Sequence, residues 1–373
     1  MVFHFPPISG GGVIVITGIA NTLAQLGHEV TIITPNLEWK GQKYEPEINE
    51  NINVKKVEIP SKSNIKIAAR RCYPNMKKAG INFCKNEQID LILTIFHPFH
   101  LVPKAAVEVG KKLNIPTIVK IDDAFYEKSS GLKSIQRKIE KFFNSKTLKT
   151  ANKIFVANQN TKNEVKNFYN LSEEKIFIMP NGIETEKFFS IKSNKKIIIF
   201  SGVMYYHRGL DILFNALPDV IKQIPDVELI LLGDGPEMKK LQDIVKERKL
   251  EKNIKFLGWI NRNEIPKYLA KSSVGIGPLR STAVTKNALP IKILEYMAAS
   301  LPIIAFENTL PNEILNHEKN GFNVKNIEEL SEKIILILKN EKLQKEFGNI
   351  SNNMIKKYDW KIVINEMLEK SKN

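Results

Sequence analysis

The chain has 373 residues, of which 43% are hydrophobic and 26% charged, and its formal net charge is +16. This length exceeds what one hydrophobic core usually serves, so the sequence predicts two folded domains. No run of about 18 apolar residues is present, which excludes a membrane-spanning helix, and no export signal is visible, so we expect a cytoplasmic protein. The two cysteines, Cys72 and Cys84, are too few for a disulfide framework.

The positive charge indicates an anionic partner, and nucleic acid, a nucleotide sugar and an anionic membrane are the three classes considered. No motif that reads DNA or RNA accompanies the charge, so we do not expect nucleic acid as a partner. Residues 62–85 carry seven cations and no acid, and residues 128–153 interleave eight cations with apolar residues. The second stretch is typical of a basic amphipathic helix on an anionic membrane, and a solvated face over the core explains it about equally well.

Short hydrophobic runs alternate with helical stretches along the whole chain, which predicts parallel sheets and an α/β fold. The predicted strands are 30–34, 91–95, 117–121, 154–157, 196–201, 228–233, 254–257, 274–277 and 303–306. In such sheets a ligand binds at the carboxyl ends of the strands.

A glycine-rich turn, Gly10-Gly-Gly12, precedes a predicted helix from about Val13 to Leu26. The main-chain N–H groups of Gly11 and Gly12 can approach an anion at the start of that helix, although a plain tight turn is the commoner explanation of such a motif. The spacing is not that of a dinucleotide-binding fingerprint, so we expect no nicotinamide cofactor.

Further along, His97 and His100 lie three residues apart but lack the additional ligands of a metal site, so we expect no metal. The turn pair Asn181-Gly182 opens a polar stretch that ends at Lys196. This stretch is the best domain boundary, which gives domains 1–189 and 190–373.

In the second half, Arg208 follows a predicted strand and stands at the start of a helix, where the helix dipole disfavours a cation and so indicates an anionic partner. Gly233 and Gly258-Trp259 follow two further strands, where glycines leave room for a ligand. Within Pro290–Pro302, Glu295 is expected on a short apolar helix that precedes a buried strand. This arrangement predicts that the carboxylate of Glu295 lies at a ligand cleft. The alternative is an ordinary amphipathic helix without a ligand.

Taken in order from Phe5 to Trp360, these motifs resemble those of the family 4 retaining glycosyltransferases, which have the GT-B fold. The matching motifs include Gly27-His-Glu-Val30, Pro180-Asn-Gly-Ile183, Leu232-Gly-Asp-Gly-Pro-Glu237 and the Glu295-Tyr-Met-Ala helix, and those in the second half of the chain are the specific ones. The resemblance implies two doubly wound Rossmann-like domains facing across a deep cleft, with a last helix, about 358–373, packing back toward the first domain. It also implies a nucleoside-diphosphate sugar as donor, no catalytic metal or cofactor, and a glycan or lipid-linked acceptor in cell-envelope polysaccharide or glycolipid synthesis.

The resemblance also implies roles for individual residues. Glu295 would hold the ribose of the donor, and Arg208, with Lys292 as a substitute for a missing second cation, would bind its diphosphate. Gly11 and Gly12 would assist from the first domain. The donor-binding residues are expected to include Gly11, Gly12, Gly233, Trp259, Asn287, Lys292 and Glu295, and the catalytic residues Arg208, Glu295 and Asp122. Asp122 or its neighbour Asp123 would bond a sugar hydroxyl.

Three departures from the family pattern motivate a second hypothesis. Asn287 stands where many relatives have a first glutamate, Val203 stands near the usual first arginine, and only Met1–His4 remains of the first strand. Either the sequence starts too late or the first strand is shortened. The alternative function is therefore a non-catalytic GT-B subunit that binds a partner glycosyltransferase or a glycan.

Overall fold

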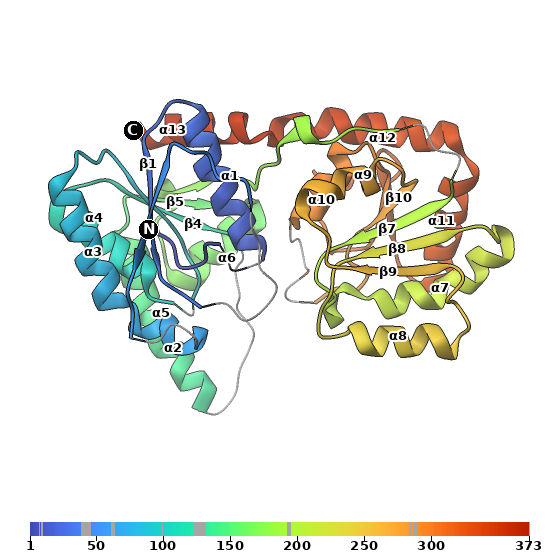
Figure 1. Cartoon of the computed structure of the whole chain (residues 1–373), viewed down its shortest axis with the longest axis horizontal. Coiled ribbons are helices and arrows are strands. Elements are labelled where there is room, and N and C mark those ends of the chain that lie inside the picture. Colours follow the sequence, from blue (N-terminus) through green and yellow to red (C-terminus); the bar gives the residue numbers. More distant parts are fainter. Residues whose placement is uncertain are drawn as a thin grey trace. The chain divides into compact units, whose positions relative to one another are not determined.

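The computed structural model describes residues 1–6, 8, 10–38, 46–60, 64–98, 100–122, 132–191, 195–282, 285 and 289–372, without the side chains of residues 66, 132–137 and 139. The chain forms two compact units (Figure 1). Met1–Gly182 and Trp360–Asn373 make the first unit, and Ile183–Asp359 makes the second. The division thus comes shortly before the predicted boundary at 189/190, and the last helix belongs to the first unit.

The first unit contains strands and helices that alternate along the chain. Its strands are β1 (Val30–Pro35), β2 (Ile52–Val57), β3 (Ile92–Ile95), β4 (Thr117–Ile121), β5 (Lys153–Val156) and β6 (Ile176–Ile178). Its helices are α1 (Gly11–Gln25), α2 (Ile65–Arg71), α3 (Tyr73–Asn86), α4 (Val102–Leu113), α5 (Leu132–Thr150), α6 (Gln159–Tyr169), the short η1 (Glu173–Lys175) and α13 (Trp360–Lys372). The strands pair in parallel as β1-β2 and as β3-β4-β5-β6.

Residues Met1–Phe3 run between these two sheets. The main-chain nitrogen of Val2 donates to the carbonyl oxygen of Ile33 (3.0 Å), and that of Met1 donates to the carbonyl oxygen of Leu93 (2.7 Å). The spatial order is therefore β2, β1, Met1–Phe3, β3, β4, β5, β6, which is the order of a doubly wound α/β domain. Met1–Phe3 thus occupy the central position of the first strand in such a domain.

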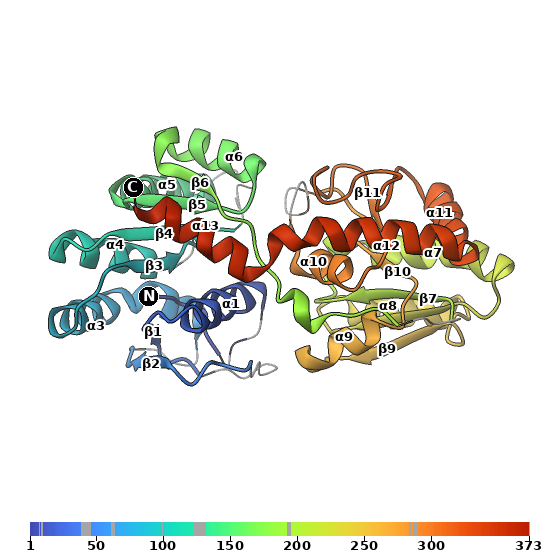
Figure 2. The same ribbon diagram turned by 90° about the horizontal axis from the view of Figure 1, so that it is seen from above.

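Helices cover both faces of this combined sheet because buried side chains alternate along each strand. On one face, Ile33 packs with buried residues of α2, α3 and α4, and Val119 packs with buried residues of α5 and α6. On the other face, Ile32 packs with α1. Helix α13 lies beside α1 (Figure 2), and its Trp360 ring fills the space that two glycines, Gly18 and Gly182, leave open.

The second unit has one six-stranded parallel sheet. Its strands are β7 (Ile197–Ser201), β8 (Glu228–Leu232), β9 (Ile254–Gly258), β10 (Val274–Ile276), β11 (Ile303–Phe306) and β12 (Gly321–Val324). The order β9-β8-β7-β10-β11-β12 is that of the Rossmann fold, with the switch between β7 and β10. A ligand crevice is therefore expected outside the carboxyl ends of these two strands.

Helices cover both faces of this sheet as well (Figure 1). They are α7 (Leu210–Gln223), α8 (Met238–Glu247), α9 (Ile265–Leu269), α10 (Ile291–Ala298), α11 (Ile327–Lys339) and α12 (Glu341–Ile355), with short η2 (Thr185–Lys187), η3 (Tyr206–Arg208), η4 (Arg262–Glu264) and η5 (Lys356–Tyr358). Buried residues of α7, α8 and α11 form one core cluster, and those of α9, α10 and α12 form another on the opposite face. None of the helices that the structure describes is both long and apolar enough to cross a membrane.

Three strands were missing from the sequence prediction. β2, β6 and β12 each lie at the edge of a sheet. Edge strands are short or carry polar residues on an exposed side, and β2 shows this with its exposed Lys55 and Lys56. Their hydrophobic pattern is correspondingly weak, which explains why they were missed.

Candidate functional site

The candidate site lies in the second unit at the carboxyl ends of β7 and β8. Gly202 follows β7 and Gly233 follows β8, with φ angles of 126° and 122°. A side chain on Gly233 would clash with the carbonyl oxygen of Gly202, because an added Cβ would lie 2.3 Å from it. The main chains at the two strand ends therefore approach each other with no side chain between them. This arrangement is typical of folds that bring the main chain close to a ligand.

Helix α10 brings two of the predicted residues to these strand ends. Pro290 precedes the helix in an extended conformation, and every residue from Lys292 to Ala298 is buried. The hydroxyl of Tyr296 accepts a hydrogen bond from the main-chain nitrogen of Ser201 (2.9 Å), the last residue of β7. This bond fixes the helix against the strand, and burial raises the pKa of Tyr296.

Lys292 is a buried cation beside Gly202. Its Nζ lies 3.5 Å from the centroid of the Phe200 ring and has no hydrogen-bond partner among the residues that the structure describes. Burial lowers the pKa of Lys292 well below its ordinary value, and the nearby charge of Arg208 lowers it further, while Glu295 acts in the opposite direction. A buried cation of this kind is a ready partner for an anion.

Arg208 and His207 lie on η3, just before α7. Burial lowers the pKa of His207 to about 4, and the charges of Arg208 and Lys292 contribute to this shift. Basic side chains of η3 and α10 therefore lie near one another. Arg280, which the sequence did not single out, stabilises this segment: its guanidinium lies over the Tyr206 ring (4.0 Å) and its Nη2 contacts Asp211 Oδ2 (2.6 Å).

Glu295 is buried, with its side chain 3% exposed, and it forms an ion pair with Arg262 (Nη1 to Oε1, 2.8 Å). Arg262 comes from η4, after β9, and its own side chain is 26% exposed. No local sequence pattern indicates Arg262 as the partner of Glu295, because the two residues are far apart in the chain. Glu295 thus lies at the strand ends as a carboxylate whose charge is already matched by a cation.

Two other predicted donor residues are Trp259, which follows β9, and Asn287, which precedes α10 in the sequence. Trp259 is half-buried and follows Gly258, whose carbonyl oxygen accepts from the main-chain nitrogen of Gly233 (2.7 Å). Asn287 lies outside the described residues. Arg208, Gly233, Trp259, Lys292 and Glu295 therefore all belong to the second unit.

The remaining predicted residues belong to the first unit. Gly11 and Gly12 form the exposed first turn of α1, so this helix begins two residues earlier than predicted, and an added Cβ on either would meet open space. Asp122 follows β4 and forms an ion pair with the buried Lys120. Asp123 lies outside the described residues.

Three histidine rings gather in the first unit. His97 and His100 stack (5.7 Å between centroids), and His4 lies 5.5 Å from His100. Burial lowers the pKa of His4 to about 4, and it lowers the pKa of the other two as well. Within the described part of the chain, no group of three or more His, Cys, Asp or Glu side chains has an arrangement that would hold a metal ion.

Known proteins resemble this chain along nearly all of its length. A family model described as glycosyl transferases group 1 matches residues 182–354, and one described as glycosyltransferase family 4 matches residues 9–187. An uncharacterized glycosyltransferase of Methanocaldococcus jannaschii is 29% identical over 292 residues, which cover 77% of this chain and 76% of the relative. The alpha-monoglucosyldiacylglycerol synthase of Acholeplasma laidlawii is 24% identical and covers 94% of this chain and 89% of its own. The crystal structure of Anabaena HepE in complex with UDP has the same fold, with a TM-score of 0.74 and 16% identity over 99% of this chain and 98% of that one.

Proposed function

This chain is a nucleotide-sugar-dependent glycosyltransferase of family 4 with the GT-B fold, and we propose that it is a retaining enzyme whose acceptor is a glycan or a lipid-linked molecule. Its product would then belong to cell-envelope polysaccharide or glycolipid synthesis. The relative from Acholeplasma laidlawii is named for the synthesis of a glucosylated diacylglycerol, which supports a lipid acceptor.

The observation that carries the proposed donor site is the buried ammonium of Lys292. Its Nζ has no hydrogen-bond partner among the described residues and faces the bare backbone at Gly202. Arg208 is near enough to lower its pKa. A diphosphate in this position would neutralise both cations and accept the hydrogen bonds of Lys292, so the charge that develops on the leaving group would be stabilised where it forms.

Glu295 is proposed to bind the ribose of the nucleotide. Its carboxylate has several lone pairs, of which the ion pair with Arg262 uses part, so Glu295 can accept bonds from ribose hydroxyls without losing its cation. Trp259 and Asn287 would contact the nucleotide and the donor sugar, and Gly233 would leave space for them. Gly11 and Gly12 would add main-chain N–H groups to the diphosphate, and Asp122 would accept a bond from a sugar hydroxyl. No metal or cofactor is required by this scheme, and turnover that persists in EDTA would be the expected result.

A panel of donors tests the enzymatic proposal. Release of nucleoside diphosphate is measured with UDP-, GDP- and ADP-sugars, with and without glycan and diacylglycerol acceptors, and the anomeric configuration of the product is read by NMR. One donor should stand out, and its product should keep the donor's configuration. Tight binding of UDP without turnover on any donor would instead favour the non-catalytic subunit, and an inverted product would refute the retaining mechanism.

A peripheral contact with an anionic membrane is also proposed, at a surface made by Phe142, Phe143, Lys104 and Arg70, which we call the basic aromatic face. Phe142 and Phe143 of α5 are 68% and 48% exposed, and their rings lie 5.7 Å apart. Arg70 of α2 approaches Glu140 of α5 (3.8 Å), on the helix that carries these rings. Apolar rings surrounded by cations suit the boundary between lipid headgroups and acyl chains.

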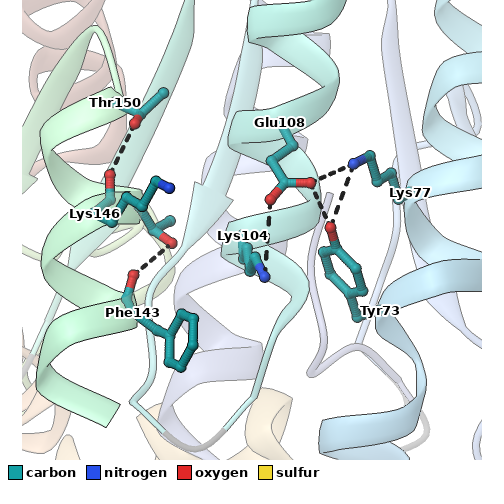
Figure 3. Close-up of polar contacts among 8 residues, drawn as sticks. Tyr73, Lys77, Lys104, Glu108, Phe143, Lys146 and Thr150 are labelled. Atoms are coloured by element: carbon teal, nitrogen blue, oxygen red, sulfur yellow. Dashed lines mark hydrogen bonds and ion pairs between the residues drawn. The ribbon is translucent and has the colours of Figure 1, made fainter. Parts of the chain in front are cut away.

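Figure 3 shows Lys104 and Phe143 of this face together with neighbouring residues of α3 and α4. Lys104 lies over the rings of Tyr73 (4.7 Å) and Phe143 (5.5 Å). Glu108 pairs with Lys77 and accepts a hydrogen bond from the hydroxyl of Tyr73, and it lies 3.9 Å from Lys104. These contacts connect α3, α4 and α5.

Liposome co-sedimentation tests the basic aromatic face. The wild-type protein should bind vesicles of phosphatidylglycerol at low salt, release them at high salt, and ignore vesicles of phosphatidylcholine, because the attraction is screened within about 10 Å at 0.1 M salt. Phe142→Ser should weaken binding, whereas Phe189→Ser, which removes a 46% exposed ring from the second unit, should not. Equal binding of the two variants would argue for a soluble acceptor.

A further inference from the structure

Lys120 is a fully buried lysine in the middle of a parallel sheet. It lies in β4, between Ile95 of β3 and Phe155 of β5, and its side chain is 0% exposed. Burying an ammonium group is costly unless its three N–H groups find acceptors. Lys120 finds them: its Nζ pairs with Asp122 Oδ1, donates to Asn181 Oδ1 (3.0 Å) and approaches the carbonyl oxygen of Met179 (3.4 Å).

These partners come from two separate segments of the first unit. Asp122 immediately follows β4, and its side chain is 17% exposed. Asn181 is buried and stands in the turn that ends the continuous part of this unit at Gly182. The main-chain nitrogen of Met179 donates to the carbonyl oxygen of Val156 (2.9 Å), which anchors this segment on β5. Lys120 therefore connects the end of β4 to the segment where the chain leaves the unit.

The alternation of side chains along β4 explains why Lys120, and neither of its neighbours in the strand, reaches the Asn181 turn. Val119 and Ile121, its neighbours in β4, point into the apolar cluster formed with α5 and α6. Lys120 points to the opposite face, where its contacts are Asp122, Asn181 and the carbonyl oxygen of Met179. An apolar side chain would avoid the cost of desolvating a charge at this position, so the buried ammonium motivates a functional hypothesis.

We propose that Lys120 is a positioning residue, whose ammonium fixes the Asp122 carboxylate at the end of β4 and ties it to the Asn181 turn. This inference rests on the proposed contact of Asp122 with a sugar hydroxyl. Lys120 contacts Oδ1, and in this proposal Oδ2 accepts the hydroxyl. Preorganisation of this kind favours turnover more than ground-state binding of the donor.

A double-mutant cycle separates positioning from a purely structural role. Lys120→Met, Asp122→Asn and the double variant are assayed by release of nucleoside diphosphate from UDP-, GDP- or ADP-glucose, whichever the wild-type protein uses fastest. Lys120→Met should lower kcat by about 10- to 100-fold with little change in the donor KM, as the loss of a charge-assisted hydrogen bond does. In the Asp122→Asn background the same substitution should lower kcat by less than about threefold, because there is no carboxylate left to position.

Val119→Ala, which destabilises the same strand without touching the polar contacts, measures how far lost stability alone reduces kcat. Lys120→Gln keeps a buried donor and replaces Lys120→Met if the latter does not fold. Equal losses from Lys120→Met in the two backgrounds, or a loss no larger than that of Val119→Ala, would overturn the inference. Full activity of Asp122→Asn would overturn it too and would remove Asp122 from the site, while leaving the proposed glycosyl transfer intact.

Discussion

Replacing Lys292 by methionine should stabilise the unliganded protein and weaken its binding of UDP. Nζ is buried over the Phe200 ring without a hydrogen-bond partner in the described part of the chain. A buried polar group in that state costs about 1–3 kcal/mol. The methionine sulfur keeps a favourable contact with the ring, so the free energy of unfolding should rise by about 1–3 kcal/mol. In a unit of this size each kcal/mol raises Tm by about 2–4 °C.

The stabilisation should depend on pH in a defined direction. The pKa of Lys292 is lower in the folded protein than its ordinary value of 10.5 in the unfolded chain. The unfolded state therefore binds more protons between the lowered pKa and pH 10.5, and the stability of the wild-type protein rises with pH across that window. The advantage of the methionine variant should be largest below the lowered pKa and should shrink as pH approaches 10.5.

Thermal unfolding with and without UDP, together with calorimetric titration, measures both effects. The affinity for UDP should fall by about 10- to 100-fold, as the loss of a hydrogen bond from a charged donor predicts. Lys333→Met is a control, because Lys333 also lies over an aromatic ring, that of Phe322 at 5.0 Å, but is only partly buried. A methionine variant at position 292 that is less stable than the wild type, or that binds UDP normally, would refute the reasoning.

Glu295→Ala should weaken UDP binding by about 10- to 100-fold in calorimetry, whereas Arg262→Ala should lower the free energy of unfolding by about 1–3 kcal/mol in urea, because it leaves a buried carboxylate unpaired. Unchanged UDP affinity in a folded Glu295→Ala variant would contradict the ribose assignment. UDP binding should take up protons between about pH 4 and 6.5, because the diphosphate raises the pKa of His207 from about 4 toward its ordinary 6.5. The affinity for UDP should therefore fall as pH rises through this range. Titrations in buffers of different ionisation enthalpy measure the uptake, and a release of protons on binding would argue against this prediction. Ser300→Gly should raise stability by about 1 kcal/mol in the same urea experiment, because Ser300 ends α10 with φ 58° and glycine adopts that conformation without strain; a loss of stability would mean that the serine hydroxyl has a role of its own.

Much of the architecture was predictable from the sequence because it depends on neighbours along the chain. Central strands are buried on both faces, so β4 and β11 were predicted with the bounds that the structure gives them. The glycine after β8, the glycine at the end of β9 and the helix that carries Glu295 are also local patterns. Together they support the resemblance to family 4 of the GT-B glycosyltransferases, which the family models and the fold confirm.

The tertiary structure decided how the charged groups are paired. Glu295 and Arg262 lie on different elements, and no local pattern links them, so the sequence predicted the carboxylate but not its cation. The same holds for Lys120, which occupies a strand position with no local sign of its partners beyond Asp122. Lys292 was expected only as a substitute cation, and its buried position over Phe200 emerges when α10 packs on β7. Hydrophobic periodicity is set by which face of an element is buried, whereas the pKa and the partner of a buried charge depend on segments that only folding brings together.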